Sequence, residues 1–343
     1  MATIPISKPF IRRKDMDAVL SCLVNDEIGP GKTTAHLEKE LRSLLKGRFS
    51  LALREYSRAV EVAYHALGLP EGATIALSAL GHPVYALVAR SLGYKVQMVD
   101  TEEDSPIIST EDLAAHAVSA SAVVVDTPLG LVADLPKIVE MGIPVIEDVS
   151  FGFGATLEER LVGTFGTVTV LGLEAKHMLT AAGGAVVVAR DRQIATRARE
   201  YAGSLLQESR LSDLNAALGI TQLGELQKQL SRREELAERF RRALGRGEHR
   251  LPGIDDRANP VWPAFPVLLS GSLKDAATYA RKHGVETENS FSGAYLAGHA
   301  RAEEAASVHR AQGFLLRSLS FPLYPRLGKE QVTTIERVLA TLP

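Results

Sequence analysis

The chain has a single cysteine, no long apolar run and almost no excess of charge. Among its 343 residues only Cys22 is a cysteine, which excludes an internal disulfide framework and a metal site built from cysteines. No stretch approaches the roughly 20 apolar residues of a membrane span, and the N-terminal segment has no apolar run of signal length. The formal net charge of −2 favours neither nucleic acid nor an anionic membrane as a partner. We therefore expect a cytoplasmic protein.

The residues that are present are those of a globular protein with a full core, 45% hydrophobic and 23% charged. Short apolar runs predict strands at residues 74–77, 95–99, 122–125, 145–148, 167–171 and 185–189. Helices are predicted between the earlier strands, at residues 82–92, 110–117 and 134–140. Because strands and helices alternate, we expect an α/β fold whose mainly parallel sheet is covered by helices on both faces.

Helical patterns flank this unit on both sides. Near the N-terminus, helices are predicted at residues 14–24, 34–45 and 57–67. Ser57 is the expected N-cap of the third helix and Gly68 its stop. A segment rich in Leu, Glu and Arg at residues 212–244 predicts one long helix or two in series. We expect a large domain at residues 1–244, including this linking helix, and a smaller α+β domain at residues 245–343.

One motif has the ending of a nucleotide-binding phosphate loop but is rejected. The segment Gly29-Pro30-Gly31-Lys32-Thr33-Thr34 ends as such a loop does. Asp26, however, stands where the pattern requires its first glycine. The segment also follows a predicted helix, whereas a phosphate loop follows a strand. We predict a plain turn at this point.

An amine and a carboxylate stand at the ends of predicted neighbouring strands. Lys176 follows the β-branched run at residues 167–170, and Asp148 closes the apolar stretch at residues 144–147. Pyridoxal phosphate chemistry needs such a pair, because the amine forms a Schiff base and the acid keeps the ring nitrogen protonated. The nine histidines show no metal-ligand spacing, so no metal site is predicted.

Several short strings, in their order and spacing, resemble the DegT/StrS family of sugar aminotransferases over nearly the whole chain. These strings lie at residues 4–9, 29–30, 144–148, 162–166, 183–187, 210–214 and 319–325. The resemblance implies the fold of type I pyridoxal phosphate enzymes, with a large domain and a smaller C-terminal domain. It also implies a homodimer with active sites at the subunit interface.

The resemblance assigns roles to four residues. It makes Lys176 the Schiff-base lysine and Asp148 the acid that pairs with the pyridinium nitrogen. It places His82 where the family has an aromatic ring that stacks on the cofactor. Ser57 matches the hydroxyl that meets the phosphate at a helix N-terminus, where backbone amides favour an anion. Arg58, the next residue, is our own candidate for a cation beside that phosphate.

The chain departs from the family at the residues that hold the phosphate and ring. A family glycine, glutamine, two pocket residues and an asparagine are replaced by Tyr56, Phe151, Leu171, Leu173 and Glu208. A carboxylate at about 4 Å from a phosphate is repelled by roughly 4 kcal/mol at an effective dielectric of 20. Arg58 would then either lie between these two anions or pair with Glu208 and fill the phosphate's place.

Two hypotheses for the function follow, together with a weaker third. The first is a pyridoxal-phosphate-dependent aminotransferase that moves an amino group from an amino acid to a nucleotide-linked keto-sugar. The alternative is a degenerate, non-catalytic member of the same fold that binds another ligand or partner, because the phosphate site is altered. The third is other cofactor chemistry, such as dehydration or decarboxylation.

Each candidate residue also has a purely structural interpretation. Lys176 is equally compatible with a surface lysine, and Asp148 with a cap at a strand end. His82 precedes a proline and suits a helix entry, while Ser57 suits an N-cap without any ligand.

Overall fold

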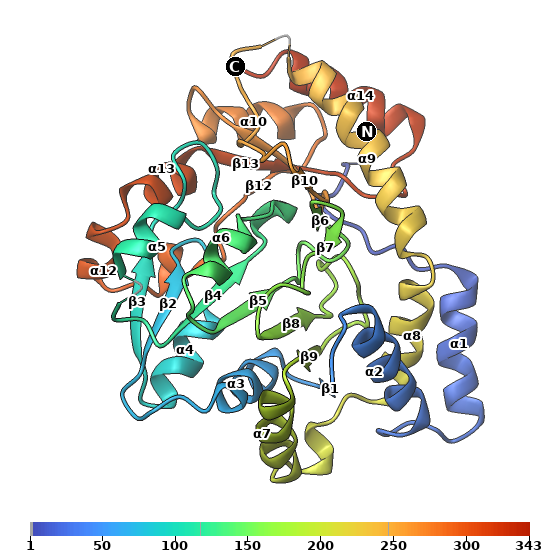
Figure 1. Ribbon diagram of the computed structural model, residues 1–343. Coiled ribbons are helices and arrows are strands. Elements are labelled where there is room, and N and C mark those ends of the chain that lie inside the picture. Colours follow the sequence, from blue (N-terminus) through green and yellow to red (C-terminus); the bar gives the residue numbers. More distant parts are fainter. Residues whose placement is uncertain (1–2, 117, 246) are drawn as a thin grey trace.

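The computed structural model describes residues 3–116, 118–245 and 247–343. Its centre is a seven-stranded sheet with the order β1-β9-β8-β5-β4-β2-β3 (Figure 1). The strands are β1 (Phe49–Leu53), β2 (Thr74–Ser78), β3 (Lys95–Val99), β4 (Ala122–Asp126), β5 (Val145–Asp148), β8 (Val168–Gly172) and β9 (Ala185–Ala189). Five of them, β8, β5, β4, β2 and β3, run parallel, whereas β9 is antiparallel to both β8 and β1. The predicted mainly parallel sheet is confirmed.

Helices cover both faces of this sheet (Figure 1). One apolar core lies under α3 (Tyr56–Leu67), α4 (Val84–Ser91) and α7 (Arg192–Gly203). The other lies under α2 (Lys32–Leu44), α5 (Thr110–His116), α6 (Leu135–Glu140) and α8 (Asp213–Leu223). Helix α1 (Arg13–Val24) packs against α8 from outside. In the described part of the chain, no helix combines the length and apolar character required to cross a membrane.

A third apolar core belongs to the C-terminal elements and the end of α9 (Leu226–Leu244). A three-stranded sheet there consists of β11 (Phe265–Leu268), β13 (Ser318–Phe321) and β12 (Glu288–Asn289). The helices beyond it are α10 (Leu273–Lys282), α11 (Tyr295–Gly298), α12 (Ala302–Ala306), α13 (His309–Arg317) and α14 (Lys329–Ala340). A further small sheet joins β10 (Ala258–Asn259), β6 (Thr156–Leu157) and β7 (Arg160–Leu161). The division at residue 244 stays a prediction.

The structure has elements beyond those expected, among them strand β1 and helix α7, which periodicity did not reveal. Of the two arrangements predicted for residues 212–244, the structure has two helices in series, because the chain breaks at Gly224 and Glu225 between α8 and α9. Ser57 is not the N-cap of α3: the helix begins one residue earlier with Glu55 as N-cap, and the Ser57 hydroxyl donates to Glu55 at 3.4 Å.

The turn before α2 is held by a carboxylate of the chain itself. Asp213 accepts hydrogen bonds from the backbone amides of Gly31 at 2.9 Å, Thr33 at 3.2 Å and Thr34 at 2.8 Å. Backbone amides at a helix N-terminus attract anions, and here the anion comes from the start of α8. The segment that ends like a phosphate loop is therefore a capped turn, as predicted.

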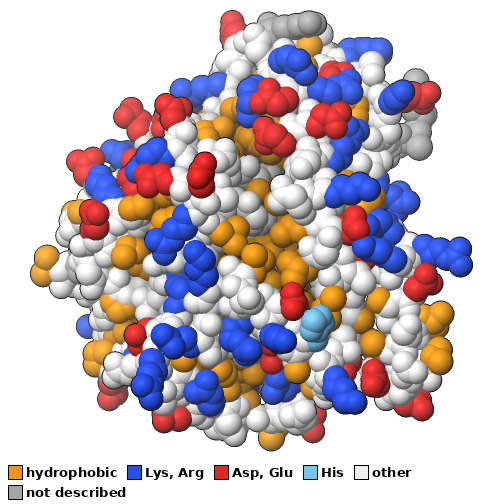
Figure 2. All heavy atoms as spheres, turned by 45° about the vertical axis from the view of Figure 1, so that its right-hand side comes forward, with side chains coloured by type: hydrophobic (Ala, Val, Ile, Leu, Met, Phe, Trp, Pro, Cys, Tyr) orange, Lys and Arg blue, Asp and Glu red, His pale blue; other side chains and the backbone are white. Residues whose placement is uncertain are grey.

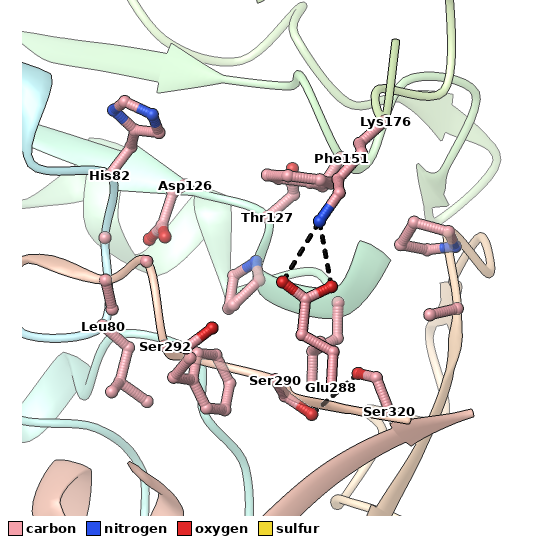
Figure 3. Close-up of a pocket in the computed structure, with 18 of the residues that line it drawn as sticks. Leu80, His82, Asp126, Thr127, Phe151, Lys176, Glu288, Ser290, Ser292 and Ser320 are labelled. Atoms are coloured by element: carbon pink, nitrogen blue, oxygen red, sulfur yellow. Dashed lines mark hydrogen bonds and ion pairs between the residues drawn. The ribbon is translucent and has the colours of Figure 1, made fainter. Parts of the chain in front are cut away.

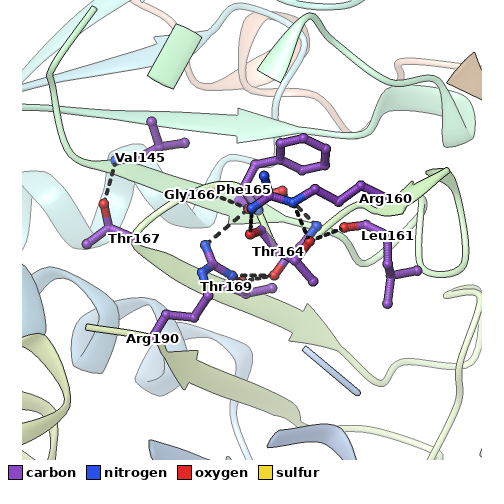
Figure 4. Close-up of polar contacts among 11 residues, drawn as sticks. Val145, Arg160, Leu161, Thr164, Phe165, Gly166, Thr167, Thr169 and Arg190 are labelled. Carbon is purple, nitrogen blue, oxygen red and sulfur yellow. Dashed lines mark hydrogen bonds and ion pairs between the residues drawn. The ribbon is translucent and has the colours of Figure 1, made fainter. Parts of the chain in front are cut away.

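A buried ion pair fixes the loop between β7 and β8. Glu147 accepts from the amides of Gly163 and Phe165, both at 2.7 Å, and pairs with Arg190 at 3.3 Å. Arg190 also donates to the Gly163 carbonyl at 2.5 Å and to the Thr169 hydroxyl at 3.2 Å (Figure 4). Glu147 is only 1% exposed, so these donors replace water around its charge. They hold the strand that ends in Asp148 against its neighbour.

We predict that Arg190→Ala lowers the free energy of unfolding by about 3–5 kcal/mol, because it leaves the buried Glu147 charge without its partner. Urea unfolding followed by circular dichroism measures this change. Arg192→Ala, at an exposed arginine two residues away, is the matched control and should change stability by less than about 0.5 kcal/mol. Equal effects of the two variants would contradict the role of the pair.

Candidate active site

Polar side chains line a cavity at the carboxyl edge of the parallel strands. Asp126 and Asp148 are the last residues of β4 and β5 and stand opposite each other in the parallel register. A cavity of about 320 Å³ opens there, with the segment from Glu288 to Ala294 as its far wall. Open α/β sheets bind ligands at this edge.

Asp148 is buried at the floor of this cavity and uses both carboxyl oxygens. Oδ1 accepts from the backbone amide of Ser150 at 2.9 Å and from its hydroxyl at 2.5 Å. The Ser150 hydroxyl in turn accepts from the Gly172 amide at 2.7 Å, which ties the end of β5 to the end of β8. Oδ2 accepts from the hydroxyl of Tyr56.

Tyr56 places its hydroxyl against the Asp148 carboxyl group. It is the first residue of α3, so its side chain points back from the helix N-terminus into the cavity. Its ring centroid lies 5.1 Å from that of His82, and Tyr85 and His177 meet it edge-on at 6.2 and 6.0 Å. Removal from water, and then the charge of Asp148, raise the pKa of the Tyr56 hydroxyl well above its usual value. The hydroxyl therefore keeps its proton and donates it.

The sequence suggested two roles for His82, at a helix entry and beside a cofactor, and its position in the structure is compatible with both. Its Nδ1 accepts from the Val84 amide at 3.1 Å at the start of α4, which makes it a helix-entry residue. Its ring also lines the cavity against Tyr56. Burial lowers its pKa, so the imidazole is neutral near pH 7 and presents an uncharged ring.

Lys176 reaches the same cavity from the side opposite His82 (Figure 3). Its Nζ pairs with Glu288 of the C-terminal sheet at 2.9 and 3.1 Å, and its side chain is 57% exposed. The loop that carries it closes through Gly183, whose amide donates to the Leu173 carbonyl at 3.0 Å, and through Gly184 at a φ of 91°. An exposed ion pair contributes only about 0–1 kcal/mol, so little holds the amine to Glu288.

Asp126 is a second carboxylate of the cavity, and the sequence analysis did not single it out. Its Oδ1 is buried and has no hydrogen-bond partner among the described residues. Burial, and then the charge of Asp148, raise its pKa to about 7. A signal for it was present, because Asp126 follows an apolar strand just as Asp148 does.

The predicted phosphate-binding residues are not brought into this cavity. Neither Ser57 nor Arg58 lines it; Arg58 pairs with Glu61 of the same helix at 2.6 Å. Glu208 lies exposed in the 3-10 turn Gln207–Ser209, and its pairing with Arg58 stays a prediction.

The other replaced positions are filled by apolar packing. Phe151 lines the cavity and meets His177 edge-on at 4.9 Å. Leu171 and Leu173 are fully buried in the core beneath α2 and α8. His177 thus packs between the rings of Phe151 and Tyr56, and burial lowers its pKa.

The cavity has the residues to hold the ring of pyridoxal phosphate, but the space for the ring itself is occupied. Asp148, His82 and Lys176 all line it, as an acid for the ring nitrogen, a ring to stack on and an amine. The space between His82 and Asp148 is filled by Tyr56. A bound ring would therefore have to displace that side chain.

A mainly parallel sheet with an acid and a lysine at its carboxyl edge defines the class of type I pyridoxal phosphate proteins. The chain belongs to the DegT/DnrJ/EryC1/StrS aminotransferase family, whose model matches residues 9–340. The resemblance inferred from short strings is thereby confirmed, and the predicted enzyme class is that of the family.

The chain is similar over nearly its full length to proteins of sugar metabolism. It is 22% identical to the spore coat polysaccharide biosynthesis protein SpsC of Bacillus subtilis, over 97% of this chain and 95% of that protein. The sugar aminotransferase CalS13 from Micromonospora echinospora has a TM-score of 0.86 at 18% identity, covering 98% and 99% of the two chains. The E. coli GDP-4-keto-6-deoxy-D-mannose-3-dehydratase with bound hydrated pyridoxal phosphate has a TM-score of 0.87 at 17% identity, covering 99% and 100%.

We predict that Asp126 makes the protein less stable as pH rises. Its pKa of about 7 in the folded chain lies above the usual value of 3.8, so the folded state holds the proton over a range of pH in which the unfolded chain has lost it. Stability should therefore fall, by up to about 1.4 kcal/mol per pH unit, between about pH 4 and pH 7. Urea unfolding from about pH 5 to pH 8 measures the slope.

The variant Asp126→Asn cannot ionise and should flatten this slope. Asp256→Asn, at an exposed aspartate, is the control and should keep the slope of the original chain. Parallel stability curves for Asp126→Asn and the original chain would show that the carboxyl group is not buried as described.

Proposed function

We propose that this chain transfers an amino group from an amino acid to a nucleotide-linked keto-sugar, with pyridoxal phosphate as cofactor. The observation that carries the proposal is that Lys176, Asp148 and His82, from three different elements, line one cavity. Family membership supports the same activity. The sugar class rests on the relatives, since SpsC is named for polysaccharide biosynthesis and CalS13 for sugar amination.

The residues of the cavity have distinct tasks in this proposal. Pyridoxal phosphate, when bound, supplies an aldehyde that condenses with amines and a ring that takes up electrons. Asp148 would hold the ring nitrogen, and His82 would stack on the ring. Lys176 Nζ would take the proton from the carbon of the amino donor and return it. To do so it must leave Glu288, which the exposed ion pair opposes only weakly.

The far wall of the cavity offers groups that suit a sugar. The hydroxyls of Ser290, Ser292 and Ser320 lie beside Glu288 on this wall (Figure 3). Hydroxyl and carboxylate groups pair with the hydroxyls of a sugar ring as donors and acceptors. The buried Asp126 oxygen, which has no partner among the described residues, is a further acceptor for a ligand hydroxyl.

The second candidate is a non-catalytic member of the family that binds a sugar-like ligand in the same cavity. The observation that favours it is the Tyr56 hydroxyl on Asp148, since this contact uses the acid that the cofactor ring would need. The positions of Ser57 and Arg58 outside the cavity point the same way. Lys176 and Glu288 would then serve as ligand contacts.

We further propose that two copies of the chain associate through α1. Met16, Leu20, Leu23 and Val24 on this helix are 57%, 55%, 47% and 73% exposed. Met16, Leu20 and Leu23 border an apolar groove that continues to Ala175, next to Lys176. Figure 2 shows hydrophobic side chains grouped on the side of the molecule where α1 lies. A second copy seated here would lie beside the Lys176 loop, as expected for shared active sites.

We predict that Lys176→Ala lowers amino transfer by about 100-fold or more, because it removes the proton-transfer group. The assay follows isotope-labelled glutamate and a nucleotide-linked keto-sugar at saturating pyridoxal phosphate. Lys274→Ala, at an exposed lysine of α10, is the control and should keep full activity. If the original chain moves no label yet still binds the sugar nucleotide in calorimetry, the second candidate replaces the first.

We predict that Leu20→Asp converts a dimer into a monomer, because it places a charge in the apolar face of α1. Analytical ultracentrifugation measures the mass of the particle. Val139→Asp, at an exposed apolar residue of α6, is the control and should leave the mass unchanged. A monomeric original chain would contradict the proposed association.

A further inference from the structure

The ring of Tyr56 occupies a place defined by two independent contacts. Its hydroxyl donates to Oδ2 of Asp148, the acid assigned to the ring nitrogen. Its ring packs against that of His82, with ring centroids 5.1 Å apart and planes tilted by 53°. A cofactor ring held between His82 and Asp148 would contact the same two residues, Asp148 through a nitrogen-bound proton and His82 through its face.

The remaining neighbours of Tyr56 keep its ring in this place. Tyr85 and His177 meet the ring edge-on at centroid distances of 6.2 and 6.0 Å. Such edge-to-face aromatic pairs stabilise a ring beyond the effect of the area that they bury. The Ser150 hydroxyl lies 3.2 Å from the Tyr56 hydroxyl. The ring is thus held on several sides, and the contact with Asp148 is not an isolated one.

Both carboxyl oxygens of Asp148 already have hydrogen-bond donors within the chain. Oδ1 accepts from the amide and the hydroxyl of Ser150, and Oδ2 accepts from the Tyr56 hydroxyl. The tyrosine proton stays in place near pH 7, because the pKa of the hydroxyl is raised well above its usual value. A donor from the cofactor ring would therefore compete with the Tyr56 hydroxyl for Oδ2.

We propose that the Tyr56 ring substitutes for the cofactor ring. It occupies the position between His82 and Asp148 that the ring of pyridoxal phosphate would take, and it competes with the cofactor for this position. The inference rests on the proposed cofactor cavity but not on amino transfer. Tyr56 then determines the affinity of this chain for the cofactor, because the cofactor binds only when Tyr56 turns away from Asp148.

The test compares cofactor binding in the original chain, Tyr56→Phe and Tyr56→Ala. Titration with pyridoxal phosphate, followed by the absorbance of the bound cofactor, gives the dissociation constants. Tyr56→Phe keeps the ring and removes only the hydroxyl, so we expect affinity to rise about tenfold, as the loss of one such hydrogen bond implies. Tyr56→Ala also removes the aromatic ring, so this variant should bind pyridoxal phosphate more tightly than Tyr56→Phe does.

Two controls accompany the titration. Tyr94→Phe removes a hydroxyl from a tyrosine that packs against Tyr64 outside the cavity, and it should leave cofactor affinity unchanged. Circular dichroism shows whether Tyr56→Ala is folded; if it is not, Tyr56→Phe alone decides. Borohydride reduction followed by mass spectrometry should find the added cofactor mass on the peptide with Lys176.

Several outcomes would overturn the proposal. Equal affinity in the original chain and Tyr56→Phe would show that the hydroxyl does not compete with the cofactor. The absence of binding in every folded variant would show that the altered phosphate contacts alone close the site. Failure of the proposed function would be a separate result. In that case the variants would still bind the cofactor more tightly than the original chain, but the original chain at saturating cofactor would transfer no amino group.

Discussion

The parallel pairing of β4 with β5 is the constraint on which the cavity depends. Backbone hydrogen bonds of the sheet set Asp126 opposite Asp148, so two carboxylates end at the same edge without any side-chain contact to bring them together. Ser150 then links this edge to the end of β8 through the Gly172 amide. The buried Glu147–Arg190 pair holds the same strand from its other face. The floor of the cavity is therefore rigid and already polar.

The side chains above this floor are held by side-chain contacts. Lys176 is more than half exposed and pairs with Glu288, so little opposes its movement toward a ligand. Tyr56 is held more firmly, by Asp148 and by the rings around it. Because it belongs to the first turn of α3, its ring can still turn about a side-chain bond without the loss of a backbone hydrogen bond. A site in which one ring replaces another needs a fixed acid and a ring that can turn.

Most of the central sheet could be predicted from the sequence, because buried parallel strands are short apolar runs bounded by turn residues. Strand β1 was not recognised, although all five of its residues are buried. It lies between two helices and pairs with β9, far along the chain, so no local signal marks it. Helix α7 was missed because its buried face consists largely of small residues, Ala195 and Ala198 beside Ile194. The N-cap of α3 was misplaced by two residues, which is within the usual uncertainty of a helix boundary.

The sequence by itself determined the family, the mainly parallel sheet and the positions of Lys176 and Asp148 at strand ends, because these follow from local patterns and their order. It also predicted a change at the residues that would hold a phosphate. Only the tertiary structure decided what took their place. Contacts such as Tyr56 on Asp148, or Lys176 on Glu288, join residues 92 and 112 positions apart. No period or motif encodes them, since they depend on which loops leave the same edge of the folded sheet.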